Sequence, residues 1–241
     1  MPYRKQQLIN GEIYHVILRG IDNNLIFKNT DDYYRGIFSI YEFNDKKSVE
    51  ILKRRRQIQT IKKKLKNGGG RASSISDQRD KLIEILTFCL MPNHIHLLTR
   101  QLRDDGITKF MRKLGTGYGS YFNRKYGRKG YVFQNRFSAV HIKDDKQLKI
   151  AFVYIHTNPI ALVEPNWKEK GIKNPKRAIK FLEEYKWSSY LDYIGRHSFP
   201  SVTERKFIWT ILNEGQGCQK FVNYWIRHKG KIKEFTGLAL E

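Results

Sequence analysis

An apolar run from Leu90 to Thr99 carries two histidines one residue apart, and it constrains the fold more than any other stretch of the chain. In a β-strand, successive side chains point to opposite faces, so His94 and His96 share one face while Ile95 takes the other. Two imidazoles held side by side on a strand form half of a metal site, which oxygen ligands from elsewhere in the chain would complete. The alternative interpretation is a pair of ordinary half-buried histidines.

The charge of the chain indicates a polyanionic partner. Its 46 Lys and Arg residues stand against 23 Asp and Glu, which gives a formal charge of +23 and a pI of about 10.0. A chain this basic repels itself when compact, and a nucleic acid that releases its counterions on contact offsets that repulsion. We therefore expect a nucleic-acid partner, although a purely structural RNA-binding protein would show the same balance.

The remaining composition indicates a compartment. No stretch approaches the roughly 20 apolar residues of a membrane span, and the N-terminus lacks the apolar core of a signal peptide. Cys89 and Cys218 lie far apart and provide no disulfide framework, which agrees with a reducing compartment. We expect a cytoplasmic protein that contacts no membrane. Cys89 could join the two histidines in a zinc site, but no fourth ligand is evident nearby.

Hydrophobic periodicity predicts the order strand, helix, strand, strand, helix, strand, helix. We expect strands over residues 12–20, 83–90, 94–99 and 137–142, and helices over 30–44, 104–127 and 144–158. Met91-Pro92-Asn93 supplies turn chemistry, so the second and third strands pair as a hairpin. This order predicts an α+β fold with a ferredoxin-like split βαβ core, in which helices cover one face of an antiparallel sheet and the middle strands present an open face to a ligand.

We expect residues 1–160 to form this core, with a basic insertion over about 46–81, and residues 161–241 to form a helical, basic C-terminal extension. The insertion reads as a basic helix followed by a flexible linker. Its cationic clusters either contact nucleic acid or form a solvated surface: Arg54, Arg55, Arg56, Lys62, Lys63 and Lys64. In the extension, helices are expected near 180–193 and 203–213. The aromatic, basic stretch after them either grips folded nucleic acid or packs on the core with Phe221, Trp225 and Leu238 buried.

The helix expected over residues 144–158 carries the second half of the site. On a period of 3.6 residues, Tyr154 and Asn158 share a stripe beside the apolar one, while His156 points to the other side. A tyrosine next to a metal-binding strand is a candidate nucleophile, because its oxygen can attack a phosphodiester that the metal has polarised. The amide oxygen of Asn158 is a candidate third metal ligand. The alternative is that Tyr154 is a packing tyrosine at a helix end.

Several segments, in chain order, resemble the IS200-like single-tyrosine HUH transposases, especially the REP-associated tyrosine transposases. They are Tyr14-His15-Val16 with Arg19-Gly20, Met91-Pro92-Asn93-His94-Ile95-His96-Leu97-Leu98, Gly130-Tyr131-Val132-Phe133-Gln134-Asn135-Arg136-Phe137, Tyr154-Ile155-His156-Thr157-Asn158-Pro159 and Trp187-Ser188-Ser189-Tyr190. Each motif is weak alone, but the ensemble is specific and spans about residues 12–193. The long insertion departs from the family pattern, and residues 198–241 have no clear counterpart in it.

The resemblance implies a ferredoxin-like catalytic core that binds Mg²⁺ or Mn²⁺ through His94, His96 and Asn158, with Tyr154 as nucleophile. It implies an enzyme that nicks and joins single-stranded, hairpin-forming DNA through a covalent 5′-phosphotyrosine. We expect such an enzyme to act as a monomer or a homodimer. The residues expected to contact its DNA are Arg19, Arg54, Arg55, Arg56, Gln134 and Arg136.

Two other functions are compatible with the charge. A non-catalytic ferredoxin-like module could bind RNA or DNA by stacking bases on its sheet. Such a module needs exposed aromatic side chains on the middle strands, where this chain has His94 and His96. A replication-initiating nickase uses similar chemistry, but the sequence offers no helicase-sized partner domain.

Overall fold

The structure of the 241-residue chain is a computed structural model that describes residues 7–51, 53–54, 56, 59–60, 77, 79–134, 136–212 and 214–228. The core consists, in chain order, of β1 (Ile13–Arg19), η1 (Ile21–Asn23), α1 (Thr30–Glu42), β2 (Ile83–Met91), β3 (His94–Gln101), α3 (Gly106–Tyr126), β4 (Ser138–Ile142) and α4 (Asp145–Thr157). After it come η2 (Asn158–Leu162), α5 (Trp167–Lys170), α6 (Pro175–Glu184), α7 (Tyr190–Tyr193), α8 (Lys206–Leu212) and α9 (Glu214–His228). The strands and helices predicted for the core are confirmed, with ends that differ by a few residues.

The strands form an antiparallel sheet in the order β2-β3-β1-β4. A two-residue turn, Pro92-Asn93, joins β2 to β3 and places Met91 opposite His94. This strand order, with α1 and α3 as the connecting helices, is the ferredoxin-like arrangement that the element order predicted. The two histidine-bearing positions therefore lie on a central strand.

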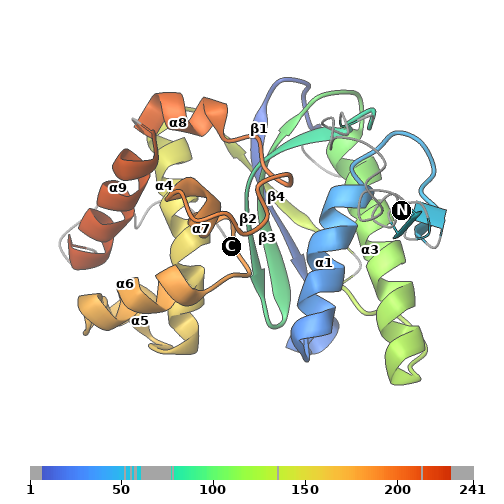
Figure 1. Cartoon of the computed structure of the whole chain (residues 1–241), viewed down its shortest axis with the longest axis horizontal. Helices are drawn as coiled ribbons and strands as arrows, with labels where there is room; N and C mark the ends of the chain where they lie inside the picture. Colours follow the sequence, from blue (N-terminus) through green and yellow to red (C-terminus); the bar gives the residue numbers. More distant parts are fainter. Residues whose placement is uncertain are drawn as a thin grey trace.

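Helices cover both faces of the sheet (Figure 1). On one face α1 and α3 pack against strand residues such as Val16 and Leu97, as expected. On the other face α4 and the C-terminal helices pack against residues such as Leu98. The prediction of an open sheet face is therefore wrong. The apolar stripe of α4, which includes Phe152, needs burial, and buried strand residues such as Leu86 and Leu98 pack with it in one cluster.

The C-terminal extension attaches to the edge of the sheet at β2. The N–H of Leu90 donates to the carbonyl of Trp187 (2.9 Å), and the N–H of Ser189 donates to the carbonyl of Phe88 (3.0 Å). Residues of α6 to α9 then join the same hydrophobic cluster as α4. The proposed boundary near residue 160 stays a prediction, but the two parts share one core.

Helix α9 shows whether the aromatic, basic C-terminal stretch packs on the core or remains available to grip nucleic acid. Trp225 is 3% exposed and stands edge-on to Trp167, with ring centroids 5.5 Å apart. Phe221 is partly buried in the same cluster, whereas Tyr224 is exposed. As far as residue 228, this stretch packs on the core as structure; Leu238 lies outside the described residues.

The two ends of the basic insertion lie side by side, between the end of α1 and the start of β2. The N–H of Lys46 donates to the carbonyl of Asp80 (2.8 Å), and the side chain of Asn44 bonds the backbone of Leu82 and Ile83. Residues 51, 53, 54, 56, 59 and 60 are helical, in agreement with the expected basic helix. The expected linker, like Arg55 and Lys62 to Lys64, falls outside the described residues. In the part of the chain that is described, no helix is both long and apolar enough to cross a membrane.

Candidate active site

Strand β3 holds His94 and His96 on the sheet face that α4 covers. In the sheet register His94 lies opposite Arg19 of β1. The two imidazole centroids are 4.6 Å apart, as the period of two predicted. His94 is 9% exposed and His96 is fully buried. The strand therefore fixes both rings next to each other inside the protein.

His15 on β1 contacts His96, although its position in the sequence did not mark it as a site residue. Its Nε2 lies 3.0 Å from Nδ1 of His96, and the two rings stack with centroids 5.1 Å apart. Nε2 of His96 is then left buried, with no hydrogen-bond partner among the described residues. An imidazole held through one nitrogen with the other available is the usual arrangement of a metal ligand.

The surroundings of His96 keep it neutral. Burial is the main cause that holds its pKa well below the usual 6.5, and the nearby His94, His15, Lys168 and Arg19 lower the pKa further. Metal binding requires the neutral imidazole. The site therefore favours the protonation state that can coordinate a cation.

Helix α4 brings Tyr154 against the histidines. The helix begins where the side chain of Asp144 accepts a hydrogen bond from the N–H of Gln147 (2.8 Å), and it gives way to η2 just before Pro159. The Tyr154 ring stands edge-on to both His15 and His96, with centroid distances of 5.9 Å in each case. A phenol from the helix and imidazoles from the strands thus meet across the interface between α4 and the sheet.

Asn158 lies one helical turn beyond Tyr154 and is 2% exposed. Its Nδ2 donates to the carbonyl of Tyr154 at 3.0 Å, which fixes the amide and turns Oδ1 away from that carbonyl. An amide oxygen is a ligand that Mg²⁺ and Mn²⁺ accept.

His156 points to the other side of α4, as predicted. Its Nε2 lies 2.8 Å from Oγ of Ser189, and burial lowers its pKa to about 3.

The described residues contain no group of three or more His, Cys, Asp and Glu side chains that could hold a metal ion. A site built on His94 and His96 therefore needs an oxygen ligand of another type, and the amide of Asn158 stays the candidate that the sequence predicts. Cys89 lies opposite His96 in the register, but burial raises the pKa of its thiol far above the usual value. Because no group of three such ligands, with Cys89 included, is found among the described residues, the structure gives the zinc alternative no support.

Arg19 and Gln134 lie at the end of the sheet that carries His94. The N–H of Gln134 donates to the carbonyl of Arg19, and the N–H of Gly20 donates to the carbonyl of Asn93, both at 2.8 Å. A Cβ on Gly20 would lie 2.4 Å from the carbonyl oxygen of Asn24, so only glycine permits this close approach. Arg19 is half-buried, whereas Gln134 and Arg136 are exposed.

Arg54 lies away from the histidines. Its Nε is 3.2 Å from the carboxylate of Glu42 at the end of α1, and the neighbouring Asn44 contacts Ile83 at the start of β2. His94 lies opposite the last residue of β2. Because a strand of 9 residues spans roughly 27 Å, the structure does not bring Arg54 to the site. Arg56 is exposed, and Arg55 lies outside the described residues.

Lys168 of α5 is a second residue at the candidate site that no sequence motif predicts. Its Nζ donates a hydrogen bond of 2.8 Å to the phenol oxygen of Tyr154. Strand alternation on β1 could have predicted His15, because it places His15 on the same face as Arg19, an expected DNA contact. No comparable signal distinguishes Lys168 among the 46 Lys and Arg residues.

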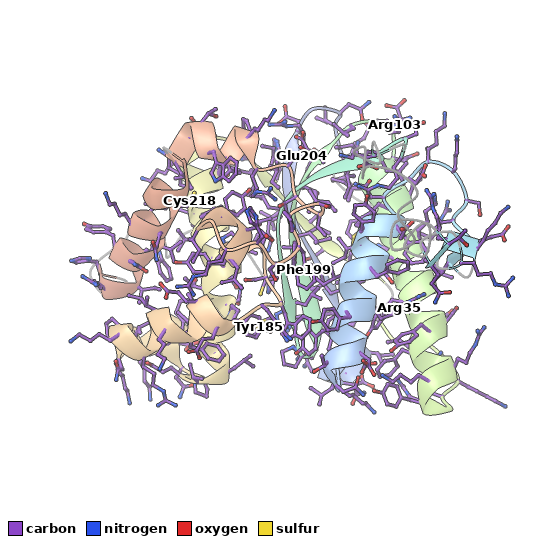
Figure 2. The ribbon with its side chains drawn as sticks, in the orientation of Figure 1. Arg35, Arg103, Tyr185, Phe199, Glu204 and Cys218 are labelled. Carbon is purple, nitrogen blue, oxygen red and sulfur yellow. The ribbon has the colours of Figure 1, made fainter. Side chains whose placement is uncertain are left out.

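A groove of about 1010 Å³ lies elsewhere, between α1 and residues 198–202. Tyr34, Phe38, Arg35 and Phe199 are among its lining residues. Figure 2 labels Arg35 on α1 and Phe199 on the segment beside it. Because neither the site histidines nor Tyr154 line this groove, its volume does not locate the candidate chemistry.

The chain is similar to a sequence family and to solved structures. The sequence model of a family described as IS200-like transposase matches residues 46–158, from the insertion to Asn158. A solved structure, described as a REP-associated tyrosine transposase bound to a REP hairpin, is similar with 17% sequence identity and a TM-score of 0.47. That similarity covers 86% of this chain and 96% of the other. Comparison with curated proteins finds no match.

Proposed function

Since residues 46–158 of this chain match the sequence model of the IS200-like transposases, we propose that the protein is a transposase-type endonuclease and strand transferase that acts on single-stranded DNA. The enzyme cleaves one phosphodiester, becomes joined to the 5′ phosphate through Tyr154, and releases a 3′ hydroxyl for the later joining step. The observation that carries this proposal is the Tyr154 ring, edge-on to His15 and His96 at 5.9 Å. This geometry places the candidate nucleophile, on helix α4, against imidazoles on strands β1 and β3.

The proposed cofactor is Mg²⁺ or Mn²⁺, held by His94, His96 and Asn158. The buried Nε2 of His96, the neutral state of its ring and the fixed amide of Asn158 fit such an ion. When bound, the ion would polarise an oxygen of the scissile phosphate as a Lewis acid.

The chain's own residues supply the rest of the reaction. His15 orients the ring of His96 through the hydrogen bond between them. The Tyr154 oxygen attacks the phosphorus, and the bond from phosphorus to the 3′ oxygen breaks. Arg19 and Gln134, at the His94 end of the sheet, bind phosphates that flank the cleaved bond.

The proposed DNA is a strand that folds into a hairpin. A single metal site on a small sheet holds one phosphate but offers little surface for reading sequence. A hairpin adds a paired stem for cationic side chains to grip, and the net charge of +23 suits that contact. The central strands β1 and β3 are covered on both faces, which argues against the alternative of a sheet that stacks bases.

The test uses the full chain, Mn²⁺ and labelled single strands from the flanks of its gene, with a scrambled strand of equal length as comparison. We expect an adduct that resists denaturation, and we expect more of it from the hairpin strand. Tyr154→Phe should lose the adduct yet bind the strand with an affinity within about twofold of the original, because only one hydroxyl is removed. Tyr224→Phe, at an exposed tyrosine, is the matched control and should keep full activity.

Three results would contradict parts of the proposal. An adduct with Tyr154→Phe would move the nucleophile to another tyrosine. Binding by the unaltered chain with no adduct would favour a non-catalytic nucleic-acid-binding module. Equal affinity for the hairpin and the scrambled strand would refute recognition of folded DNA.

A further inference from the structure

Lys168 joins the candidate active site from outside the segment that matches the transposase family. It lies on α5, beyond residue 158, where the family match ends. Its Nζ donates to the phenol oxygen of Tyr154 at 2.8 Å and lies 4.8 Å from the centroid of the same ring. The cation therefore sits at the atom that would attack the DNA.

The packing of α5 fixes this position. Trp167, next to Lys168, is 1% exposed and stands edge-on to Trp225 of α9 at 5.5 Å. The N–H of Trp167 also donates to the carbonyl of Glu164 (3.2 Å). Lys168 itself is half-buried, whereas Lys170 on the same short helix is exposed. The C-terminal extension thus holds one ammonium group at Tyr154 through the hydrophobic cluster that it shares with α4 and the sheet.

We propose that Lys168 is a catalytic residue of the strand-transfer reaction, an inference that rests on the proposed function of Tyr154. In cleavage, the Tyr154 oxygen bonds to phosphorus and the 3′ oxygen departs with the electron pair of its bond. The phenol proton passes to water, and the 3′ oxygen takes a proton from water. In joining, a 3′ oxygen attacks phosphorus and the Tyr154 oxygen departs. The ammonium of Lys168 stabilises the negative charge on the Tyr154 oxygen in both directions.

The hydrogen bond also sets the direction of attack. Rotation about the Cα–Cβ bond of Tyr154 would move its phenol oxygen, and a donor at 2.8 Å restricts where that oxygen lies. A lysine that only bound the DNA backbone would gain nothing from a bond to the tyrosine oxygen. Lys168 therefore differs from the many surface cations of this chain, whose effect falls on affinity rather than on rate.

The experiment compares single-turnover rates of the full chain at saturating hairpin DNA with Mn²⁺, for adduct formation and for release by an added 3′-hydroxyl strand. Lys168→Met, which keeps the length of the stem, is expected to slow both steps roughly 100-fold, as loss of a donor to developing charge does. Its affinity for the strand should stay within about twofold of the original. Lys168→Arg, which keeps the charge, should recover most of the rate, and Lys170→Met is the matched control that should change neither quantity.

The outcomes separate this inference from the proposed function. No adduct from the unaltered chain would overturn both. An active unaltered chain together with an equally fast Lys168→Met would overturn the role of Lys168 alone. So would a Lys168→Met that binds the strand more weakly but keeps its saturating rate. If Lys168→Met unfolds at lower temperature, Lys168→Arg decides: a folded Arg variant as slow as the Met variant would also overturn the inference.

Discussion

At the scale of single residues, spacing predicted which side chains share a face and could not predict which faces meet. The period of two placed His94 beside His96, and the helical period placed Asn158 one turn from Tyr154. The contact of His15 with His96 depends on which strand pairs with β3 and in which register, and that information is not local. Lys168 could not be predicted either, because its contact with Tyr154 is also non-local and a four-residue helix carries no periodicity to locate it.

The hydrogen bond between His15 and His96 leads to a prediction about metal affinity. His15→Ala removes the group that orients the His96 ring, so we expect Mn²⁺ to bind about 10- to 100-fold more weakly. His15→Gln keeps a polar group within reach of Nδ1 and should lose less. The measurement is the Mn²⁺ concentration that gives half-maximal adduct formation, with thermal unfolding as a check on folding. The same half-maximal concentration in His15→Ala would show that His15 only fills space.

At the scale of elements, the core was predictable because each of its strands and long helices carries its own hydrophobic period. The helix expected over residues 180–193 is instead two helices, α6 and α7, separated by the segment that pairs with β2. Local periodicity could not reveal that this segment follows the sheet edge, because its contacts come from residues about 100 positions earlier in the chain. Nor could it show that the extension would cover the second face of the sheet.

The start of α1 gives a prediction about stability. Asn29 and Asp32 form a capping box, and the Asp32 carboxylate also accepts hydrogen bonds from Lys125 and Tyr126, each at 2.7 Å. Its side chain is fully buried. Asp32→Asn should therefore lower the free energy of unfolding by roughly 2 to 4 kcal/mol. Asp31→Asn, at an exposed position in the same turn, is the control and should cost less than about 1 kcal/mol.

This effect should depend on pH with a definite sign. Burial alone would raise the pKa of Asp32, but hydrogen bonds from Lys125, Tyr126 and the N–H of Lys28 prevail and hold it below the usual 3.8. A carboxylate with a lowered pKa in the folded state contributes its full stability above pH 3.8, and that contribution is lost as the pH falls through the folded pKa. Denaturant titrations of the original chain and of Asp32→Asn should differ more at pH 7 than at pH 3. A difference that does not change with pH would contradict this assignment.

At the scale of the whole molecule, the net charge predicted the class of partner but not which cations serve it. Arg54 is ion-paired with Glu42, whose side chain is 5% exposed, so one of the expected phosphate contacts also stabilises the fold. Trp225, expected either to stack on bases or to pack, belongs to the core. Composition gives the total charge of the chain. Tertiary contacts decide which charged side chains stabilise the fold and which remain available to bind nucleic acid.

The last prediction separates these two uses of charge. Salt weakens binding in proportion to the number of phosphates neutralised, and each contact to a single strand contributes about 0.7 to the slope of log K against log salt. If the insertion contacts phosphates, replacing Lys62, Lys63 and Lys64 by Gln should reduce the magnitude of that slope by up to about 2, equally for hairpin and scrambled strands. Arg54→Gln is the comparison, because its ion pair with Glu42 predicts a loss of thermal stability with little change in slope. An unchanged slope for the triple variant would show that these lysines form a solvated surface and contact no phosphates. A reduced slope for Arg54→Gln would show that this arginine leaves Glu42 to bind the strand.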